Sequence, residues 1–276
     1  MENINKHYKV PEYTCNAHLH IIDPAYPNNG KAREQKGTVE EYMEIAKRLA
    51  LPRAVFVQAK VFGMDNTCLT DAIQKFGKDK AVGIAVVNQT VSDSYLKDLD
   101  AAGVKGLRFS VWNPNNAVVS LDDCLPLSKR VVDMGWCIQL HMSASQLVQN
   151  KKMICDIPCN VVIDHMGRLD PALGTDDPAF DIICRLVEKG NFWVKLCGPY
   201  LNTTSSAPWL DAAKTARAYV ARIPERLVWG TDFPHVTEKT KYNEQVFTDL
   251  IPEWISSKEL QKKILSDNPS KLYNFK

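Results

Sequence analysis

Short apolar runs recur along the chain at fairly even spacing, and most of them are followed by a stretch with helical periodicity. Val, Ile and Leu dominate these runs, and most runs are apolar on both faces, as in parallel strands that helices cover. Eight strands are therefore predicted, over residues 14–22, 53–59, 81–87, 106–112, 137–142, 160–166, 192–197 and 226–233.

The stretches between the runs carry apolar residues three and four positions apart. In the first of them Tyr42 and Leu49 belong to one apolar stripe, and Thr38 with Glu41 resembles a capping box. The pattern predicts helices over residues 38–50, 66–79, 92–103, 120–135, 176–190 and 207–224, and two closing helices within 241–273.

Strands that alternate with helices in this way predict an α/β fold of the (β/α)8 TIM-barrel type. An open doubly wound sheet is the alternative, but no Gly-rich phosphate loop follows any predicted strand. Because the composition does not change along the chain and no low-complexity linker interrupts it, we expect residues 1–276 to form a single barrel domain.

Charge and cysteine content exclude several classes of protein. The 34 basic and 32 acidic residues leave a net charge of +2 without a dense basic block, so we expect no nucleic-acid partner. Apolar runs are too short for a membrane span, and the first ten residues are too polar for a secretory signal. The 8 cysteines form no C-x-x-C pair, so we expect mostly reduced core thiols and a cytoplasmic protein.

Polar residues gather where the predicted strands end, which is where a TIM barrel carries its active site. Of the 6 histidines, 4 fall at such positions and a fifth, His235, follows closely. Burying so many polar groups costs free energy unless they share partners, which favours a functional site. The residues at the strand ends or just after them are His18, His20, Gln58, Lys60, Arg108, Ser110, Gln139, His141, His165, Arg168, Tyr200, Asp232 and His235.

Several motifs together resemble one known superfamily. "HLH" at 18–20, "DHMGR" at 164–168 and "WGTDFPH" at 229–235 look like those of the amidohydrolase superfamily, in the same order. "VQAKVFGMDN", "GLRFS" and "NPSKLY" extend the resemblance over nearly the whole chain, to the 2-pyrone-4,6-dicarboxylate hydrolase-like group of lactonases. The resemblance implies an amidohydrolase-type barrel and a hydrolase that opens a carboxylated lactone by attack of water.

The resemblance also implies roles for four residues. Asp232 is expected to be the general base that deprotonates the attacking water. His18, His20 and His165 are expected to polarise the lactone carbonyl, either directly or through a metal ion.

Binding of the substrate is expected to involve two arginines. The guanidinium groups of Arg108 and Arg168 match a carboxylate, although a buried salt bridge and a loop contact are the alternatives for them. Pro114 and Tyr200 stand where the resembling enzymes carry further arginines, which favours a sugar-acid lactone or a mono-carboxylated lactone as substrate. Further substrate contacts are predicted for His141, Tyr200, Lys60, Gln58 and His235.

A metal site and a metal-free mechanism both remain open at this point. His18, His20, His141 and Asp232 could hold one divalent ion, and zinc suits such a ligand set. No candidate for a carboxylated lysine is evident, so a binuclear centre is not expected.

Three further functions compete with lactone hydrolysis. The first is lactone isomerisation, because the chain also resembles a lactone isomerase of the same group that acts on a galactarolactone-like sugar acid. The presence of both His18 and Asp232 favours hydrolysis over isomerisation. The second is a metal-dependent decarboxylase, and the third is a ligand-binding barrel without chemistry. The sequence leaves a homo-oligomer open.

Overall fold

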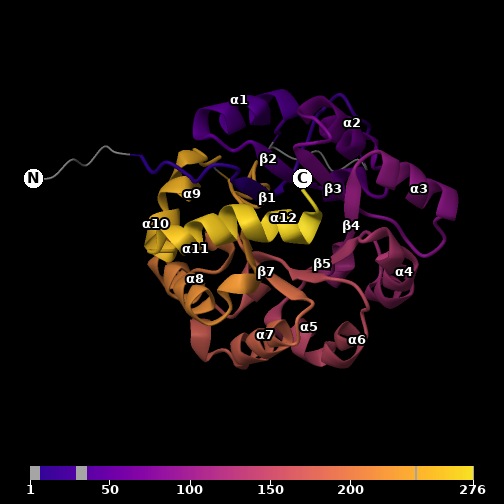
Figure 1. Ribbon diagram of the computed structural model, residues 1–276. Helices are drawn as coiled ribbons and strands as arrows, with labels where there is room; N and C mark the ends of the chain where they lie inside the picture. Colours follow the sequence, from indigo (N-terminus) through magenta and orange to yellow (C-terminus); the bar gives the residue numbers. More distant parts are fainter. Residues whose placement is uncertain (1–6, 29–35, 240, 276) are drawn as a thin grey trace, which may run out of the picture.

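Eight parallel strands form one sheet in a computed structural model that describes residues 7–28, 36–239 and 241–275. Each strand pairs with the next one along the chain, from β1 to β8. With helical segments on the outside, this order is the predicted (β/α)8 barrel, which is confirmed (Figure 1). The strands are β1 Cys15–Leu19, β2 Arg53–Val57, β3 Ala81–Ala85, β4 Val104–Ser110, β5 Cys137–His141, β6 Val161–Ile163, β7 Phe192–Leu196 and β8 Leu227–Trp229.

The ring of strands closes between β1 and the segment that follows β8. The backbone N–H of His20 donates to the carbonyl of Phe233 over 2.7 Å, and that of Asp232 donates to the carbonyl of His18 over 2.9 Å. Leu19 and Phe233 form a parallel bridge at the same place. Closure of the barrel therefore places Asp232 directly beside the two histidines at the end of β1, His18 and His20.

The helices surround the strands, and α12 lies across one end of the barrel (Figure 1). Two short helices, α5 and α6, fill the connection between β5 and β6, where no helix was predicted. The helices are α1 Val39–Leu49, α2 Thr67–Phe76, α3 Asp93–Ala101, α4 Cys124–Val131, α5 Ala144–Gln149, α6 Lys151–Cys155, α7 Pro178–Glu188, α8 Leu210–Arg222, α9 Gln245–Asp249, α10 Ile251–Trp254, α11 Lys258–Lys262 and α12 Asn268–Tyr273.

The closing segment forms four short helices instead of the two predicted ones. Pro252 stands in the first turn of α10, where its missing N–H separates this helix from α9. A π-helical stretch, Lys263–Asp267, lies between α11 and α12. Apolar periodicity over 241–273 located helical structure correctly, but it did not reveal these interruptions.

Most predicted strands are longer than the observed ones, and the difference is greatest for β1, β6 and β8. β6 and β8 end at Ile163 and Trp229, and the chain then turns out of the sheet. His165 has a φ of +50° and Asp232 a φ of +64°, in the left-handed region that non-glycine residues rarely adopt. His165 begins a 3₁₀ turn after β6 and Asp232 lies in the loop after β8, and such strained backbone is typical of functional sites.

The interior of the barrel is packed with side chains. Cys15, Ala17, Val55 and Trp193 belong to one buried cluster inside the ring, and Tyr273 of α12 closes it at one end. A second cluster joins the outer faces of the strands to the helices. Each fully buried aliphatic side chain contributes about 1.5–3 kcal/mol, so these layers fix the scaffold on which the site is built.

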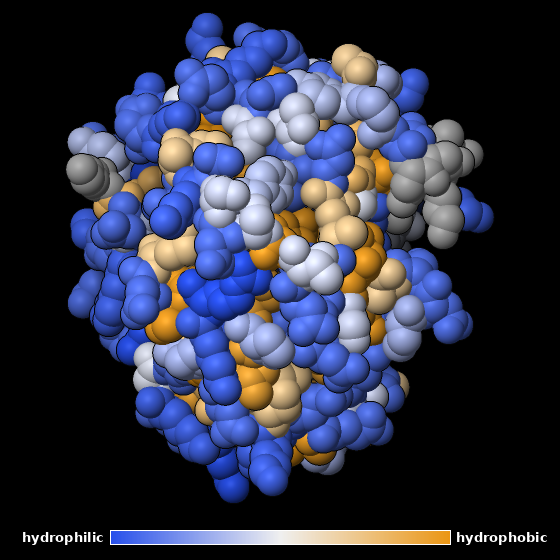
Figure 2. Space-filling view, turned by 90° about the vertical axis from the view of Figure 1, so that its right-hand side faces the viewer, coloured by the Kyte–Doolittle hydropathy of each residue, from blue (hydrophilic) through white to orange (hydrophobic). Residues whose placement is uncertain are grey.

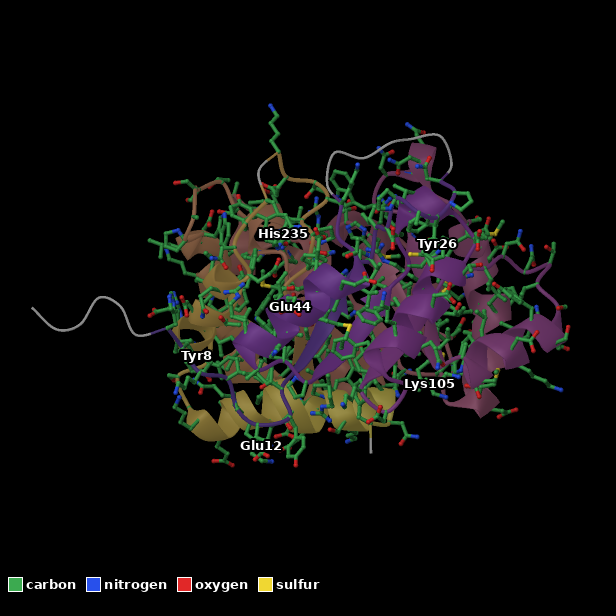
Figure 3. The ribbon with its side chains drawn as sticks, turned by 90° about the horizontal axis from the view of Figure 1, so that it is seen from above. Tyr8, Glu12, Tyr26, Glu44, Lys105 and His235 are labelled. Carbon is green, nitrogen blue, oxygen red and sulfur yellow. The ribbon has the colours of Figure 1, made fainter. Side chains whose placement is uncertain are left out.

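Labelled residues mark the two ends of the barrel. Figure 3 views the molecule from a side on which His235 and Tyr26 lie toward one end, and Glu12 and Lys105 toward the other. Figure 2 shows the side of α3, where hydrophilic residues cover most of the surface. In the described part of the chain no helix is long and apolar enough to cross a bilayer.

All eight cysteines lie in the described part and are free thiols, as predicted. Seven of them are buried and Cys155 is half-buried.

Candidate active site

Four histidines converge where β1, β5 and β6 end. The ring centroids of His18 and His20 are 5.1 Å apart, those of His18 and His165 4.8 Å, and those of His141 and His165 5.0 Å. Burial lowers the pKa of each ring, to about 4 for His18 and well below 6.5 for the other three. The site therefore contains neutral imidazoles, and the tautomer of each ring decides whether it donates or accepts.

Asp232 faces His18 and His20 at the end of β1. Its Oδ1 lies 3.4 Å from Nε2 of His18 and 3.6 Å from Nε2 of His20, and its Oδ2 accepts a hydrogen bond of 2.5 Å from the hydroxyl of Tyr200. Burial raises the pKa of Asp232 to about 7, although the bond from Tyr200 and the charge of Arg108 oppose this shift. A carboxylate that titrates near neutral pH is well matched to general-base catalysis.

His20 has a defined tautomer because its partner can only accept. Its Nδ1 lies 2.8 Å from the backbone carbonyl of Val57, so Nδ1 carries the proton and donates. The lone pair of Nε2 then points to the side of Asp232. His20 can accept a hydrogen bond there or ligate a metal ion.

A buried ionic network lies beneath His18. Nδ1 of His18 lies 3.3 Å from Nζ of Lys195 and 3.4 Å from Oδ1 of Asp164. Asp164 also accepts a bond of 3.0 Å from the amide of Gln139 and lies 3.5 Å from Nε of Arg108. Burial alone would raise the pKa of Asp164, but the contacts with His18, Lys195 and Arg108 hold it well below its usual range.

Sequence reasoning assigned no role to Asp164 and Lys195. Each is a single charged residue in an otherwise apolar strand-like run, "VVIDHM" and "FWVKLC". A charge in such a run is a signal in itself, because it is costly to bury without a partner.

The predicted metal ligands are only partly brought together. His18, His20 and Asp232 offer three ligand atoms within 4.8 Å of one another. Nε2 of His18 is buried without a hydrogen-bond partner among the described residues, as expected of an atom that could ligate an ion. His141 is not part of this group, and its Nδ1 pairs instead with the hydroxyl of Ser110 at 2.9 Å.

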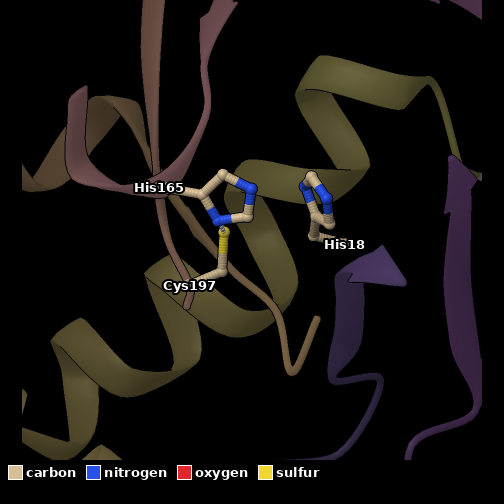
Figure 4. Close-up of side chains that lie close together, drawn as sticks. All are labelled: His18, His165 and Cys197. Carbon is tan, nitrogen blue, oxygen red and sulfur yellow. Dashed lines mark hydrogen bonds between the residues drawn. The ribbon is translucent and has the colours of Figure 1, made fainter. Parts of the chain in front are cut away.

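A second group of possible ligands combines His18 and His165 with Cys197 (Figure 4). Sγ of Cys197 lies 3.2 Å from Nδ1 of His165. Burial raises the pKa of the Cys197 thiol well above 9, so the sulfur keeps its proton at neutral pH.

The two predicted carboxylate-binding arginines differ in their surroundings. Arg108 is buried against Asp164, which agrees with the salt-bridge alternative. Arg168 lies 4.6 Å above the ring of Trp112, and that ring is stacked on His141 at 6.5 Å with an interplanar angle of 7°. Arg168 is therefore the more accessible candidate for a substrate anion.

Three further predicted contacts have partners within the protein. Lys60 donates to Asn116 over 2.9 Å, and the amide of Gln58 donates to the carbonyls of Gly63 and Asp65. His235 is fully buried, with its ring 4.8 Å from that of Phe247 and its Nε2 3.3 Å from Glu244. Contacts of Gln58 and His235 with substrate stay predictions.

A cavity of about 160 Å³ opens beside the histidines. His20, His141, Lys60 and Trp112 contribute to its wall, together with Ile22, Ala59, Ser110, Asn113, Asn116, Val236 and Thr237. Two larger hollows, of about 430 and 510 Å³, lie away from the histidines, so size does not identify the site. Convergent polar groups with shifted pKa values are the better guide.

The family model described as amidohydrolase matches residues 15–275. The chain belongs to the amidohydrolase family. A 2-pyrone-4,6-dicarboxylate hydrolase from Comamonas testosteroni is 30% identical, with 96% of this chain and 92% of the relative covered. A 4-sulfomuconolactone hydrolase from Hydrogenophaga intermedia is 29% identical, with 96% and 90% covered. The predicted resemblance to this family and its lactonase group is confirmed, and the chain is an enzyme of the amidohydrolase family.

Further amidohydrolase relatives widen the comparison. A D-galactarolactone isomerase from Agrobacterium fabrum is 25% identical, with 95% of this chain and 91% of the relative covered. A crystal structure of a probable 2-pyrone-4,6-dicarboxylic acid hydrolase from Acinetobacter baumannii, with citric acid bound, superposes with a TM-score of 0.84 at 25% identity. That superposition covers 95% of this chain and 100% of the other.

Proposed function

We propose that this amidohydrolase is a lactonase that opens a carboxylated lactone by attack of water, with Asp232 as the general base. One observation carries the proposal. The carboxylate of Asp232 is buried between His18, His20 and Tyr200, and its pKa is raised to about 7. Such a group can take a proton from water at neutral pH and retain it while the ring opens.

Polarisation of the carbonyl is assigned to His18 and His165. Both rings are neutral near pH 7, since burial lowers their pKa values, so each can offer an N–H donor to the oxygen without carrying a charge. Preorganised donors of this kind stabilise a tetrahedral oxyanion, and the loss of one such donor costs about 10²- to 10³-fold in rate.

The size and charge of the cavity support a small substrate with one carboxylate. About 160 Å³ suits a single lactone ring, and Arg168 lies over Trp112 of the wall, whereas Lys60 of the same wall already donates to Asn116. Arg108 is already engaged with Asp164. A mono-carboxylated lactone therefore fits better than a dicarboxylate.

A divalent ion, zinc being the simplest choice, would be held by His18, His20 and Asp232. When bound, it would supply Lewis-acid polarisation of the carbonyl and lower the pKa of a bound water. His20 is suited to this role because its Nδ1–H is fixed by Val57, which leaves Nε2 as the ligand atom. Elemental analysis of the purified protein tests for the ion.

Lactone isomerisation is the second candidate, supported by the similarity to the galactarolactone isomerase. It would use the same bound carbonyl with an internal hydroxyl group as nucleophile. Isomerisation leaves a lactone as product, whereas hydrolysis leaves an open acid, and proton NMR distinguishes the two.

A panel of lactones tests the proposal. Mono-carboxylated, dicarboxylated, sugar-acid and uncharged lactones are incubated with purified protein, and acid release is followed with a pH indicator. We expect acid from a carboxylated lactone, and a rate about 10²- to 10⁴-fold lower with Asp232→Asn. Unchanged turnover in Asp232→Asn, with the fold intact by circular dichroism, would exclude Asp232 as the base.

A further inference from the structure

Cys197 is the first residue after β7, and its side chain is fully buried against the histidine cluster. Its Sγ lies 3.2 Å from Nδ1 of His165, within the range of a sulfur hydrogen bond. Figure 4 shows the thiol below the ring, with the opposite ring nitrogen turned toward His18. The contact therefore involves Nδ1 of His165, and Nε2 of the same ring faces the active site.

The next residue holds the chain close to the same ring. Gly198 has a φ of +59°, and a Cβ at this position would lie only 2.7 Å from Nδ1 of His165. No side chain larger than hydrogen fits there without displacing the ring. Gly198 thus allows the turn after β7 to place Cys197 in contact with His165.

The proton in this contact belongs to sulfur. A thiol is a weak acceptor, whereas the unprotonated nitrogen of a neutral imidazole accepts well. Burial also raises the pKa of this thiol and lowers that of the ring, which favours S–H and neutral imidazole over an ion pair. With Nδ1 accepting, the single ring proton of His165 must be on Nε2.

We propose that Cys197 is a positioning residue whose S–H donates to Nδ1 of His165 and thereby keeps Nε2–H as a donor for the lactone carbonyl. The catalytic part of this inference rests on the proposed lactonase function, and the tautomer part does not. Cys197 does not touch the substrate; it acts through His165.

His20 shows why the tautomer matters. The carbonyl of Val57 forces the opposite tautomer on His20, with the proton on Nδ1 and the lone pair on Nε2. A developing oxyanion needs donors, and a neutral histidine donates only from its protonated nitrogen. The thiol of Cys197 and the carbonyl of Val57 therefore fix opposite tautomers, so that His165 donates from Nε2 and His20 accepts at Nε2.

The tautomer is measured directly by long-range nitrogen–proton NMR of the ¹⁵N-labelled protein, without substrate. Signals of His165 are assigned by their loss in His165→Gln. We expect the Nε2–H pattern in the wild type and in Cys197→Ser, which keeps a donor, and a mixture of tautomers in Cys197→Ala. An Nδ1–H pattern in the wild type, or an unchanged pattern in Cys197→Ala, overturns the proposal; the wild-type spectrum decides even if Cys197→Ala does not fold.

The rate of lactone opening provides the second readout. Loss of one neutral hydrogen bond is expected to lower kcat about tenfold in Cys197→Ala with KM little changed, and Cys197→Ser should recover most of the rate. Cys184→Ala is the matched control, because Cys184 is also fully buried but lies on α7. Equal losses in Cys184→Ala and Cys197→Ala would indicate a packing effect and overturn the positioning role. If no lactone is opened, the NMR result still stands by itself, and the proposed function alone fails.

Discussion

The hydroxyl of Tyr200 donates a hydrogen bond to Oδ2 of Asp232 over 2.5 Å, while the other oxygen of this carboxylate faces His18. Burial raises the pKa of Tyr200 well above 10, so the phenol keeps its proton throughout the working range. Tyr200 therefore stabilises the ionised form of Asp232 and offsets part of the rise in its pKa that burial causes.

Removal of this hydroxyl is expected to shift the pH profile of the enzyme. In Tyr200→Phe the pKa of Asp232 rises further above about 7, so the acidic limb of kcat/KM moves to higher pH, by about one unit for a bond to a charged group. Tyr242→Phe is the control, because Tyr242 stacks on Tyr200 but donates to Glu238. An unshifted limb in Tyr200→Phe would contradict the assignment of Asp232 as the titrating base.

Substitution of Arg168 is expected to weaken recognition of the substrate carboxylate. Arg168→Met should raise KM for a carboxylated lactone about 10- to 100-fold and leave an uncharged lactone nearly unaffected. Arg226→Met is a matched control, because Arg226 also lies over a tryptophan, Trp193, at 4.8 Å. Equal effects of the two substitutions on KM would show that Arg168 contributes only through packing.

The buried pair of Asp164 and Lys195 is expected to be strongly coupled. Asp164→Asn and Lys195→Met should each lower the free energy of unfolding by about 3–5 kcal/mol, because each leaves a buried charge without its partner. The double variant should lose less than the sum, as measured by chemical denaturation. The exposed pair of Asp181 and Arg185 on α7 is the control and should show little coupling, and additive losses for the buried pair would contradict the prediction.

Glu244 is expected to make stability depend on pH. Burial raises its pKa from 4.5 to about 8, so between these values the folded state holds a proton that the unfolded state has released. Stability contributed by this group therefore falls as the pH rises through that window. Glu244→Gln should remove the fall, giving a variant whose Tm advantage over the wild type grows from pH 5 to pH 8.

The exposed Glu253 provides the control for this experiment. Glu253→Gln should leave the pH dependence of Tm unchanged. A Tm difference between wild type and Glu244→Gln that stays constant with pH would show that Glu244 does not titrate in this window.

The barrel could be predicted because its strands are buried on both faces and its helices on one. Burial on both faces of a strand gives a continuous apolar run, whereas burial of one helix face gives apolar residues three and four positions apart. Both patterns are present over most of the chain. Interruptions of a helix by local backbone geometry leave no such pattern in the sequence. For this reason the short helices α5 and α6, and the division of the closing segment, were not predicted.

The proximity of the candidate site residues was predictable where they belong to strand-end motifs, as with His18, His20, His165 and Asp232. It was not predictable where the role depends on a partner far away in the chain. Lys195 is 177 positions from the ring that it contacts, and no periodicity relates the two residues. The predicted metal set does not extend to His141 for the same reason, since its neighbours are fixed by the register of β4 and β5.

Hydrolysis in water enriched in oxygen-18 tests the central claim most directly. A carboxylated lactone that the enzyme turns over is incubated in labelled water, and the product is analysed by mass spectrometry with the wild type and with Asp232→Asn. Attack of water on the carbonyl predicts a ring-opened acid with one labelled oxygen in its new carboxylate, formed by the wild type and almost absent with Asp232→Asn. A product that is still a lactone and carries no label would contradict the account and establish isomerisation instead.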